Sequence, residues 1–241
     1  MTFHNRRMKT LGLIGGTSWV STVEYYRIIN QTVNARLGGL NSAMLYLYSL
    51  NLEELKPSAD PAMLNVIAET LTGIAQKLQH AGAECLVICA NTPHIVAGRI
   101  QDQITIPIIH IAEVTALEIR KNNHKKVGLL GTKVTMEENF FRQKLADHEI
   151  GAIIPGEEDR EFIHFSITGE LGKGIFTAET RLGYLSIIEK LVSKGAEAII
   201  LGCTEIPLLI KPADCPVPVF DTTLIHATAA AEFALDGTPA V

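Results

Sequence analysis

Two cysteines stand at corresponding ends of two expected strands, and the chemistry available to them is proton transfer. Cys89 closes the apolar segment LVIC, and Cys203 closes the segment IILGC. A thiol has an unperturbed pKa of about 8.5, so a cysteine can take up or deliver a proton near neutral pH. Two such groups on opposite faces of one carbon can remove a proton from one side and return another from the far side, which inverts the centre. Sequences that could start a helix follow both cysteines, and their N–H groups are expected to favour the thiolate form.

The elements that must position these thiols follow an α/β pattern. Short β-branched apolar segments alternate with longer segments of helical periodicity, and Gly or Pro usually marks the change. The first apolar segment, 10–16, is typical of a strand in a parallel sheet that is covered on both faces. The helix expected after it carries Val23, Tyr26, Ile29 and Val33 on one face, and we expect that face to be the buried one.

The second half of the chain repeats the first. The matching segments, in the same order in both halves, are LGLIGGTS (11–18) with VGLLGTKV (127–134), GAECLVICANTP (82–93) with GAEAIILGCTEIP (195–207), and TIPIIHIAEVTA (105–116) with CPVPVFDTTLIHATA (215–229). A solenoid repeat is typically about 20–50 residues long, so a repeat of this length indicates a duplicated domain.

The repeat predicts two pseudo-symmetric α/β domains, each with a central, mostly parallel sheet flanked by helices. We place the first domain at 1–115, joined by the C-terminal segment 219–241, and the second at 116–218. In open α/β sheets, ligands bind beyond the carboxyl ends of the strands. If the halves face each other across a pseudo-two-fold axis, Cys89 and Cys203 approach one cleft from opposite sides. We therefore expect the active site in the cleft between the domains.

Four motifs spread over almost the whole chain resemble the cofactor-independent aspartate/glutamate racemase superfamily, and its aspartate racemase branch in particular. They are IGGTSWVSTVEYYRIIN, CANTPH, LLGTKVTM and LGCTEIP. Glutamate racemases of the cell-wall pathway carry an Asp-Ser pair after the first strand, where this chain has Gly15, Gly16 and Thr17. The resemblance implies two α/β domains with the active site between them, Cys89 and Cys203 as the two bases, and a homodimer.

The resemblance also implies which polar side chains hold the substrate beside the thiols. Asn91 and Thr92 match the family's C-x-N-T motif, and Thr204 and Glu205 match its G-C-T-E motif. In the family, these groups hold the α-carboxylate and the amine of the amino acid. Two equivalent loops supply further expected contacts, namely Thr17 and Ser18 in the first domain and Thr132 and Thr135 in the second.

Recognition of the substrate's distal carboxylate is less fully specified. Lys173, in ELGKG, resembles a lysine that some aspartate racemases place near that group. Some members also carry an arginine just after the second strand, but residues 48–54 of this chain read YSLNLEE. The resemblance therefore leaves the choice between aspartate, glutamate and a broader substrate range open.

Composition argues against several other classes of protein. With 21 basic and 26 acidic residues, the net charge is −5, and a cationic surface for nucleic acid or anionic lipid is not expected. The apolar segments are far shorter than the roughly 18 residues of a membrane span. The segment MTFHNRRMKT leads into LGLIGG without a separate apolar region and cleavage site, so no secretion signal is expected. These features predict a cytoplasmic protein with reduced cysteines.

Neither a metal nor an organic cofactor is predicted. The four cysteines, Cys85, Cys89, Cys203 and Cys215, contain no C-x-x-C pair, which argues against a zinc site. The run LGLIGG lacks the G-x-G-x-x-G of dinucleotide-binding proteins. No phosphate-binding P-loop is present, and nothing singles out a lysine for a pyridoxal phosphate enzyme. The three histidines His94, His110 and His226 are interpreted mainly as packing or loop residues.

The sequence thus predicts a cofactor-independent racemase that interconverts L- and D-aspartate, or glutamate, by two-base proton transfer. Two alternatives remain open. One is a dicarboxylate isomerase or decarboxylase of the same superfamily, which would use one or both cysteines. The other is a non-catalytic amino-acid sensor in which hinge closure reports binding. Trp19, Tyr25 and Tyr26 are expected in the core or in a dimer surface.

Overall fold

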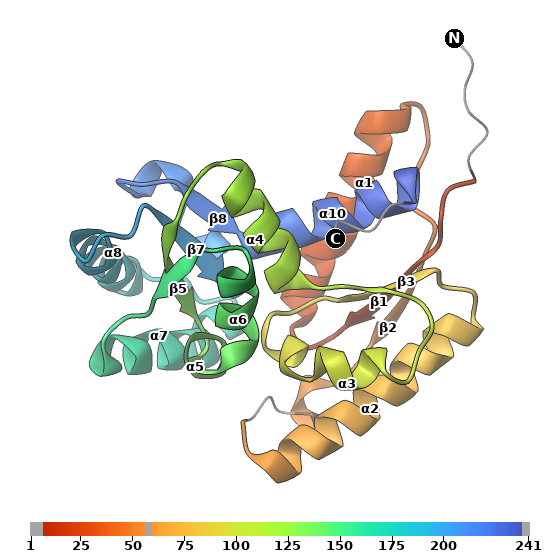
Figure 1. Cartoon of the computed structure of the whole chain (residues 1–241), viewed down its shortest axis with the longest axis horizontal. Helices are drawn as coiled ribbons and strands as arrows, with labels where there is room; N and C mark the ends of the chain where they lie inside the picture. The colour runs from red at the N-terminus through yellow and green to blue at the C-terminus, as the bar shows by residue number, and fades with distance from the viewer. Residues whose placement is uncertain (1–6, 56–58, 238–241) are drawn as a thin grey trace.

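The computed structural model describes residues 7–55 and 59–237 and contains two parallel β-sheets, each covered by helices (Figure 1). The first sheet has the strand order β2-β1-β3-β4, and the second has the order β6-β5-β7-β8. The strands of the first sheet are β1 (Leu11–Gly15), β2 (Leu45–Ser49), β3 (Cys85–Ile88) and β4 (Ile108–Ile109). Those of the second are β5 (Lys126–Gly131), β6 (Gly151–Ile153), β7 (Ala198–Gly202) and β8 (Val219–Asp221).

The two sheets have the same topology. In each, the first strand of the half pairs with the second strand on one side and with the third on the other, and the described ladders are all parallel. The predicted α/β fold with two pseudo-symmetric halves is confirmed. The outer parts of the predicted domain ranges, 1–6 and 238–241, lie outside the described residues.

Helices cover both faces of each sheet. In the first half they are α1 (Trp19–Leu37), α2 (Pro61–His80), α3 (Ala97–Gln101) and α4 (Ile111–Lys121), with 3-10 turns at Leu52–Glu54 and Thr92–Val96. In the second half they are α5 (Lys133–Glu137), α6 (Asn139–Asp147), α7 (Glu157–Gly169), α8 (Ala178–Ser193), α9 (Ile206–Leu209) and α10 (Thr222–Asp236), with 3-10 turns at Leu171–Lys173 and Pro212–Asp214. None of the described helices is long and apolar enough to cross a bilayer.

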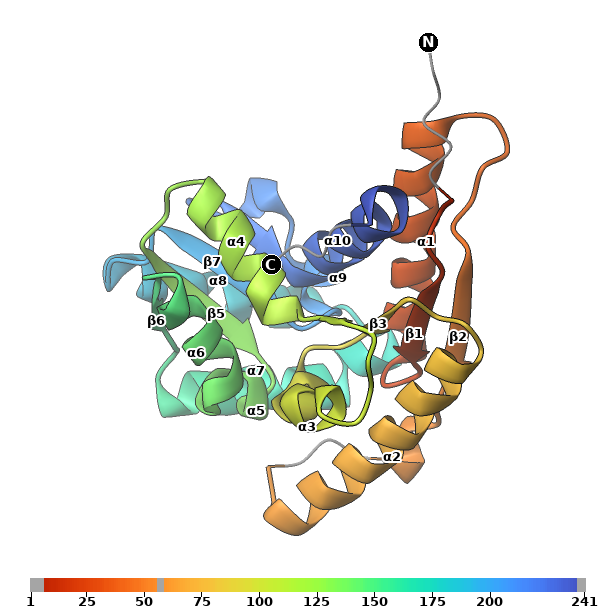
Figure 2. The same ribbon diagram turned by 45° about the vertical axis from the view of Figure 1, so that its right-hand side comes forward.

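Each sheet is covered partly by a helix that comes from the other half of the sequence. Helix α10 packs against α1 on the first sheet, and α4 packs with α6 on the second sheet (Figure 2). The chain therefore crosses between the halves at 109–111 and at 221–222. The predicted boundaries fall inside α4 and just before β8, which pairs with β7. From this packing we propose that the second unit spans about 111–221, with α10 in the first.

The buried face of α1 differs from the predicted one. Ile29 and Val33 are buried as expected, but Val23 and Tyr26 are 55% and 54% exposed, and Tyr25 is fully buried instead. Neighbouring residues of a helix are about 100° apart, so Val23 lies nearly opposite Tyr25. The periodicity predicted the helix correctly but only part of its buried face, because α10 covers the Tyr25 side.

A tight turn at Gly16 leads from β1 into α1. Gly16 has a φ of +84°, and a Cβ at this position would lie 2.0 Å from the carbonyl oxygen of Leu50. The turn is held by the bond from Leu50 N to Gly15 O, 3.0 Å, and by the bond from Gly16 N to Thr22 Oγ1, 2.8 Å. Glycine is required here both by the backbone angle and by the close approach of the β2 end.

Gly16→Ala should therefore destabilise the protein by about 3 kcal/mol or more, since a residue held in a sparsely populated backbone region costs roughly 1–3 kcal/mol and the clash adds to it. Gly174→Ala is the matched control, because Gly174 has a φ of +76° but no described atom within 4 Å of the added carbon. It should cost only about 1–2 kcal/mol. Urea unfolding of both variants measures the difference, and equal losses would show that the approach to Leu50 does not matter.

Candidate active site

The two cysteines occupy equivalent places in the two sheets. Cys89 follows β3 directly and Cys203 follows β7, and these strands hold the same position in the two strand orders. Cys89 is 0% exposed and Cys203 is 8% exposed. Because Cys89 has no exposed surface, we expect a ligand to reach its sulfur only after the halves move apart.

Threonine hydroxyls from both halves meet at Thr92, three residues after Cys89 in the sequence. Thr92 Oγ1 lies 3.0 Å from Thr132 Oγ1 and 3.3 Å from Thr135 Oγ1. The Oγ1 atoms of Thr132 and Thr135 are 3.1 Å apart, because Thr132 caps α5 and its hydroxyl accepts from Thr135 N. The structure thus brings together three of the predicted binding residues, one from the first half and two from the second.

Asn91 is oriented by the segment that crosses back to the first half. Its Nδ2 donates to Thr222 Oγ1 at 3.0 Å, and Thr222 Oγ1 donates to the carbonyl of Leu201 at 2.9 Å. The single hydroxyl proton of Thr222 is used in the hydrogen bond to Leu201, so Thr222 can only accept from Asn91, and this fixes the orientation of the amide. The other amide atom, Asn91 Oδ1, is buried and has no partner among the described residues.

Glu205 is the centre of the hydrogen bonds around Cys203. Its Oε2 accepts from the Cys203 thiol at 3.0 Å and from Thr204 Oγ1 at 2.9 Å, and its Oε1 accepts from Ser21 Oγ at 3.0 Å. The hydroxyls of Ser21 and Thr204 also touch each other. Ser21 belongs to α1 and therefore reaches Glu205 from the other half of the molecule.

Ser21 is a site residue that the sequence reasoning missed. It lies within the motif IGGTSWVSTVEYYRIIN, and it shares the buried face of α1 with Tyr25. A signal was present, because a hydroxyl on the buried side of a helix needs a polar partner. Its partner, however, lies more than 180 residues away in the sequence, and only the fold brings them together.

The two predicted site residues in the loop before α1, Thr17 and Ser18, have different surroundings. Ser18 is the N-cap of α1, and its hydroxyl accepts from Ser21 N at 3.4 Å. Thr17 Oγ1 is buried without a partner among the described residues. With Thr92 and apolar neighbours such as Pro93, Thr17 lines a cavity of about 10 Å³, which is the space of about one water molecule.

Lys173 is not brought to the other predicted site residues by any described contact. It ends the 3-10 turn Leu171–Lys173 and is exposed. Within the part of the chain that the structure describes, its ammonium group has no hydrogen bond or ion pair. The sequence placed it near a distal carboxylate, and this remains a prediction.

The surroundings of both thiols favour the protonated form. Burial raises the pKa of Cys89 above the ordinary thiol value. Burial also raises the pKa of Cys203, and the negative charge of Glu205 raises it further, while the N–H groups of Glu205 and Thr204 lower it by less. The N–H groups after Cys203 thus act in the expected direction, but burial outweighs them. The helical turns after the cysteines are short, and their dipoles do not offset the loss of water.

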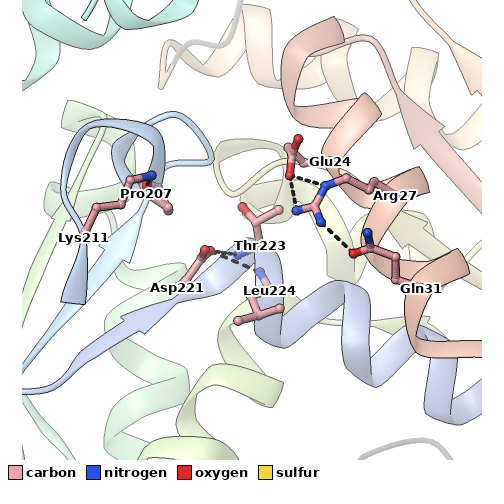
Figure 3. A network of polar contacts seen from close by, with 8 residues as sticks. All are labelled: Glu24, Arg27, Gln31, Pro207, Lys211, Asp221, Thr223 and Leu224. Atoms are coloured by element: carbon pink, nitrogen blue, oxygen red, sulfur yellow. Dashed lines mark hydrogen bonds and ion pairs between the residues drawn. The ribbon is translucent and has the colours of Figure 1, made fainter. Parts of the chain in front are cut away.

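Polar side chains from both halves surround the start of α10 (Figure 3). Asp221 caps this helix by accepting from Thr223 N at 2.9 Å and from Leu224 N at 3.1 Å. Burial raises the pKa of Asp221, as does the charge of Glu24 on α1, while Lys211 of the second half lowers it. Beside it, Thr223 Oγ1 is buried without a described partner.

A buried histidine cluster supports both crossings between the halves. The His94 ring lies 4.7 Å from that of His110 and 5.4 Å from that of His226. His110 caps α4 by accepting from Ala112 N, and His226 on α10 bonds Ile109 O and the Tyr25 hydroxyl, both at 2.7 Å. The predicted packing role fits these contacts. Burial lowers the pKa of His94 to about 4, that of His110 to about 2 and that of His226 to about 3.

These lowered values predict a loss of stability in mild acid. An unfolded histidine gains its proton near pH 6.5, but the buried ones stay neutral until about pH 4 or below. The free energy of unfolding should therefore fall as the pH drops from 6.5 towards 4, by up to about 1.4 kcal/mol per pH unit for each histidine. Urea unfolding at a series of pH values measures this slope.

His226→Gln should reduce the slope by about one proton, whereas His80→Gln, at an exposed position, should leave it unchanged. An unchanged slope in His226→Gln would contradict the assignment.

The described residues contain no group of three or more His, Cys, Asp or Glu side chains that could hold a metal ion.

The comparisons with known proteins match nearly the whole chain. The family model Asp/Glu/Hydantoin racemase matches residues 14–230. A crystal structure of a proposed Asp/Glu racemase from Yersinia pestis is 48% identical and has a TM-score of 0.88, covering 95% of this chain and 100% of that one. An aspartate racemase homologue from Pyrococcus horikoshii is 34% identical and has a TM-score of 0.82, with the same coverage.

A curated relative is more distant. A glutamate racemase from Limosilactobacillus reuteri is 25% identical over 139 residues, which are 57% of this chain and 51% of that enzyme. The match therefore spans about half the length of that glutamate racemase.

Proposed function

This chain belongs to the Asp/Glu/hydantoin racemase family, and from this premise we propose that it interconverts the L and D forms of an acidic amino acid, aspartate or glutamate, without a cofactor. Cys89 and Cys203 are the two bases. One observation carries the proposal: the two thiols end equivalent strands, and each lies within three residues of side chains that bond across the two halves.

The reaction exchanges one proton on each face of Cα. A thiolate on one side takes the proton, so that a C–H bond breaks and an S–H bond forms. The thiol on the other side then gives its proton to the carbanion, so that its S–H bond breaks and a new C–H bond forms. The two sulfurs end with their roles exchanged. Starting from two thiols, one sulfur first passes its proton to water or to a nearby carboxylate; the positive α-ammonium group of the substrate favours this step, because an opposite charge nearby lowers a thiol pKa.

Unpartnered buried groups support a ligand between the halves. Asn91 Oδ1, Thr17 Oγ1, Thr223 Oγ1 and His94 Nε2 are buried without a described partner, and such a group costs about 1–3 kcal/mol. In our proposal, Asn91 Oδ1 accepts from the substrate ammonium and Thr17 donates to its α-carboxylate. The remaining predicted contacts are Ser18, Thr92, Thr132, Thr135, Thr204 and Glu205. Lys173 meets the distal carboxylate once its loop closes on the ligand.

Substrate entry requires a hinge. Over residues 7–55 and 59–237, the chain crosses between the halves at the two points described above, 109–111 and 221–222, and in our proposal separation there exposes both thiols without unfolding either sheet. Closure then removes water, which strengthens the electrostatic interactions of the bound amino acid.

Removing either sulfur should abolish racemisation. Cys89→Ala and Cys203→Ala each lack one of the two proton carriers, so kcat should fall by at least about 100-fold, the smaller end of the usual contribution of acid–base groups. Single enantiomers of aspartate, glutamate and uncharged amino acids are incubated with each protein in D₂O and separated by chiral chromatography. Cys89→Ser and Cys203→Ser should retain exchange of the α-proton on one face.

Cys215→Ala is the matched control, because Cys215 is a partly exposed cysteine outside the site, and it should keep full activity. Full activity in both Cys89→Ala and Cys203→Ala would contradict the mechanism. Conversion of a dicarboxylate without racemisation would indicate an isomerase or decarboxylase instead. Aspartate binding without deuterium exchange at Cα would indicate a sensor.

We further propose that the protein acts as a homodimer in the cytoplasm, where its cysteines stay reduced. On α1, Trp19, Val23 and Tyr26 form an exposed apolar stripe, and Trp19 is 72% exposed. Next to α1, the edge strand β2 has exposed Tyr46 and Leu47. A stable interface buries about 800 Å² on each partner, and we propose that the α1 stripe is the apolar centre of this one.

Light scattering coupled to size-exclusion chromatography should give twice the chain mass of 26.2 kDa. Trp19→Ser should shift the protein towards the monomer, since a large exposed aromatic side chain contributes strongly to an interface. Leu182→Ser is the control, because Leu182 is an exposed apolar residue on α8 in the other half. A wild-type monomer, or a dimer that Trp19→Ser leaves intact, would contradict this interface.

A further inference from the structure

Ser21 connects the two halves at the carboxylate that holds the Cys203 thiol. It lies in the first turn of α1, which packs on the first sheet, and is 1% exposed. Its hydroxyl leaves that half and donates to Glu205 Oε1, in the loop that follows β7 of the second sheet. The hydroxyl of Thr204, in the same loop, also contacts it.

The two oxygens of Glu205 have different partners. Oε2 accepts from Cys203 and Thr204, which are its own sequence neighbours and stay beside it in any arrangement of the halves. The described bond to Oε1 comes from Ser21, in the opposite half. A carboxylate buried to 4% exposure depends on such bonds, because burying a charge without partners is costly. The orientation of Glu205 therefore depends on whether the halves are closed.

We propose that Ser21 is a positioning residue that couples closure of the two halves to activation of Cys203. With the halves closed, the bond from Ser21 fixes the rotation of the Glu205 carboxylate, so that Oε2 faces the sulfur. When they open, that bond is lost and the carboxylate is free to turn into water. This inference rests on the proposed racemase function and concerns the Cys203 side of it.

The proton transfer that Ser21 supports is local. The S–H bond of Cys203 breaks and an O–H bond forms on Glu205 Oε2, which leaves a thiolate and a neutral carboxyl group. The bound substrate ammonium favours this exchange, and the thiolate then takes the Cα proton. In the opposite direction, Cys203 enters as the thiol and Glu205 as the neutral carboxyl group; Cys203 gives its proton to Cα, and Glu205 then returns its proton to the sulfur. After product release in the first direction, exchange with water returns one proton to Cys89 and removes one from Glu205, which restores the two thiols and the carboxylate.

Ser21→Ala should lower kcat by about 10- to 100-fold, the range expected for loss of one hydrogen bond to a charged group. KM should change by less than about threefold, because Ser21 does not touch the substrate in this account. Thr32→Ala is the matched control: it deletes a hydroxyl from the same helix at a partly buried position and should change neither constant. Urea unfolding of both variants shows whether each is folded.

A second readout follows the Cys203 thiol itself. The pH dependence of its alkylation by iodoacetamide is measured by peptide mass spectrometry. Because Glu205 raises the pKa of Cys203, a carboxylate that turns away should move the alkylation midpoint to lower pH by about one unit. Loosened packing would also lower this pKa, because burial is the largest cause that raises it; the shift is assigned to Glu205 only if Ser21→Ala produces no further shift in the Glu205→Gln background.

A double-mutant cycle with Glu205→Gln decides whether Ser21 acts through Glu205. Ser21→Ala should add less than about twofold to the loss in the Glu205→Gln background, because the group it positions is already altered. The proposal would be overturned if the losses of kcat in Ser21→Ala and Glu205→Gln multiply in the double variant. A raised KM with unchanged kcat, or an unmoved alkylation midpoint, would also overturn it. If the wild type racemises no amino acid, the proposed function fails, but the alkylation midpoints of the variants still test the link from Ser21 to Cys203.

Discussion

The removal of two thiols from water is the constraint on which the rest of the structure depends. Cys89 and Cys203 follow the equivalent strands β3 and β7, and burial raises the pKa of both thiols. A protonated, dry thiol is a poor base, so one sulfur must lose its proton when the site is used. The groups that can manage this change are a cationic substrate and the buried carboxylate of Glu205, whose Oε2 lies 3.0 Å from the Cys203 sulfur.

The two sides of the site are not equivalent, although the fold that carries them is. Cys203 donates to a carboxylate, whereas the bond described for Cys89 runs to the carbonyl of Val87 at 3.8 Å. The duplication places the two cysteines at equivalent strand ends, and the residues that follow each cysteine in the sequence make the two surroundings different. Hydroxyl contacts such as Thr92 with Thr132, and Ser21 with Glu205, join the halves directly across this asymmetric centre. Closure and chemistry therefore depend on the same side chains.

The sequence was sufficient for the fold class, the repeat and the position of both cysteines at strand ends, because these follow from local apolar patterns and from a comparison of the chain with itself. It was insufficient where distant segments decide the outcome. The inner face of α1 runs through Tyr25 rather than Val23 because α10 returns to cover it. Ser21 escaped notice because its partner lies in the other half, and the thiolate was expected because burial cannot be read from spacing.

A crystal structure of the protein with a bound acidic amino acid tests the central claim most directly. Our account predicts that the amino acid lies between the halves, with the sulfurs of Cys89 and Cys203 on opposite faces of Cα and each about 3–3.5 Å from it, the separation of atoms that are poised to react. An amino acid bound with both sulfurs on one face, or at a site away from either cysteine, would contradict it.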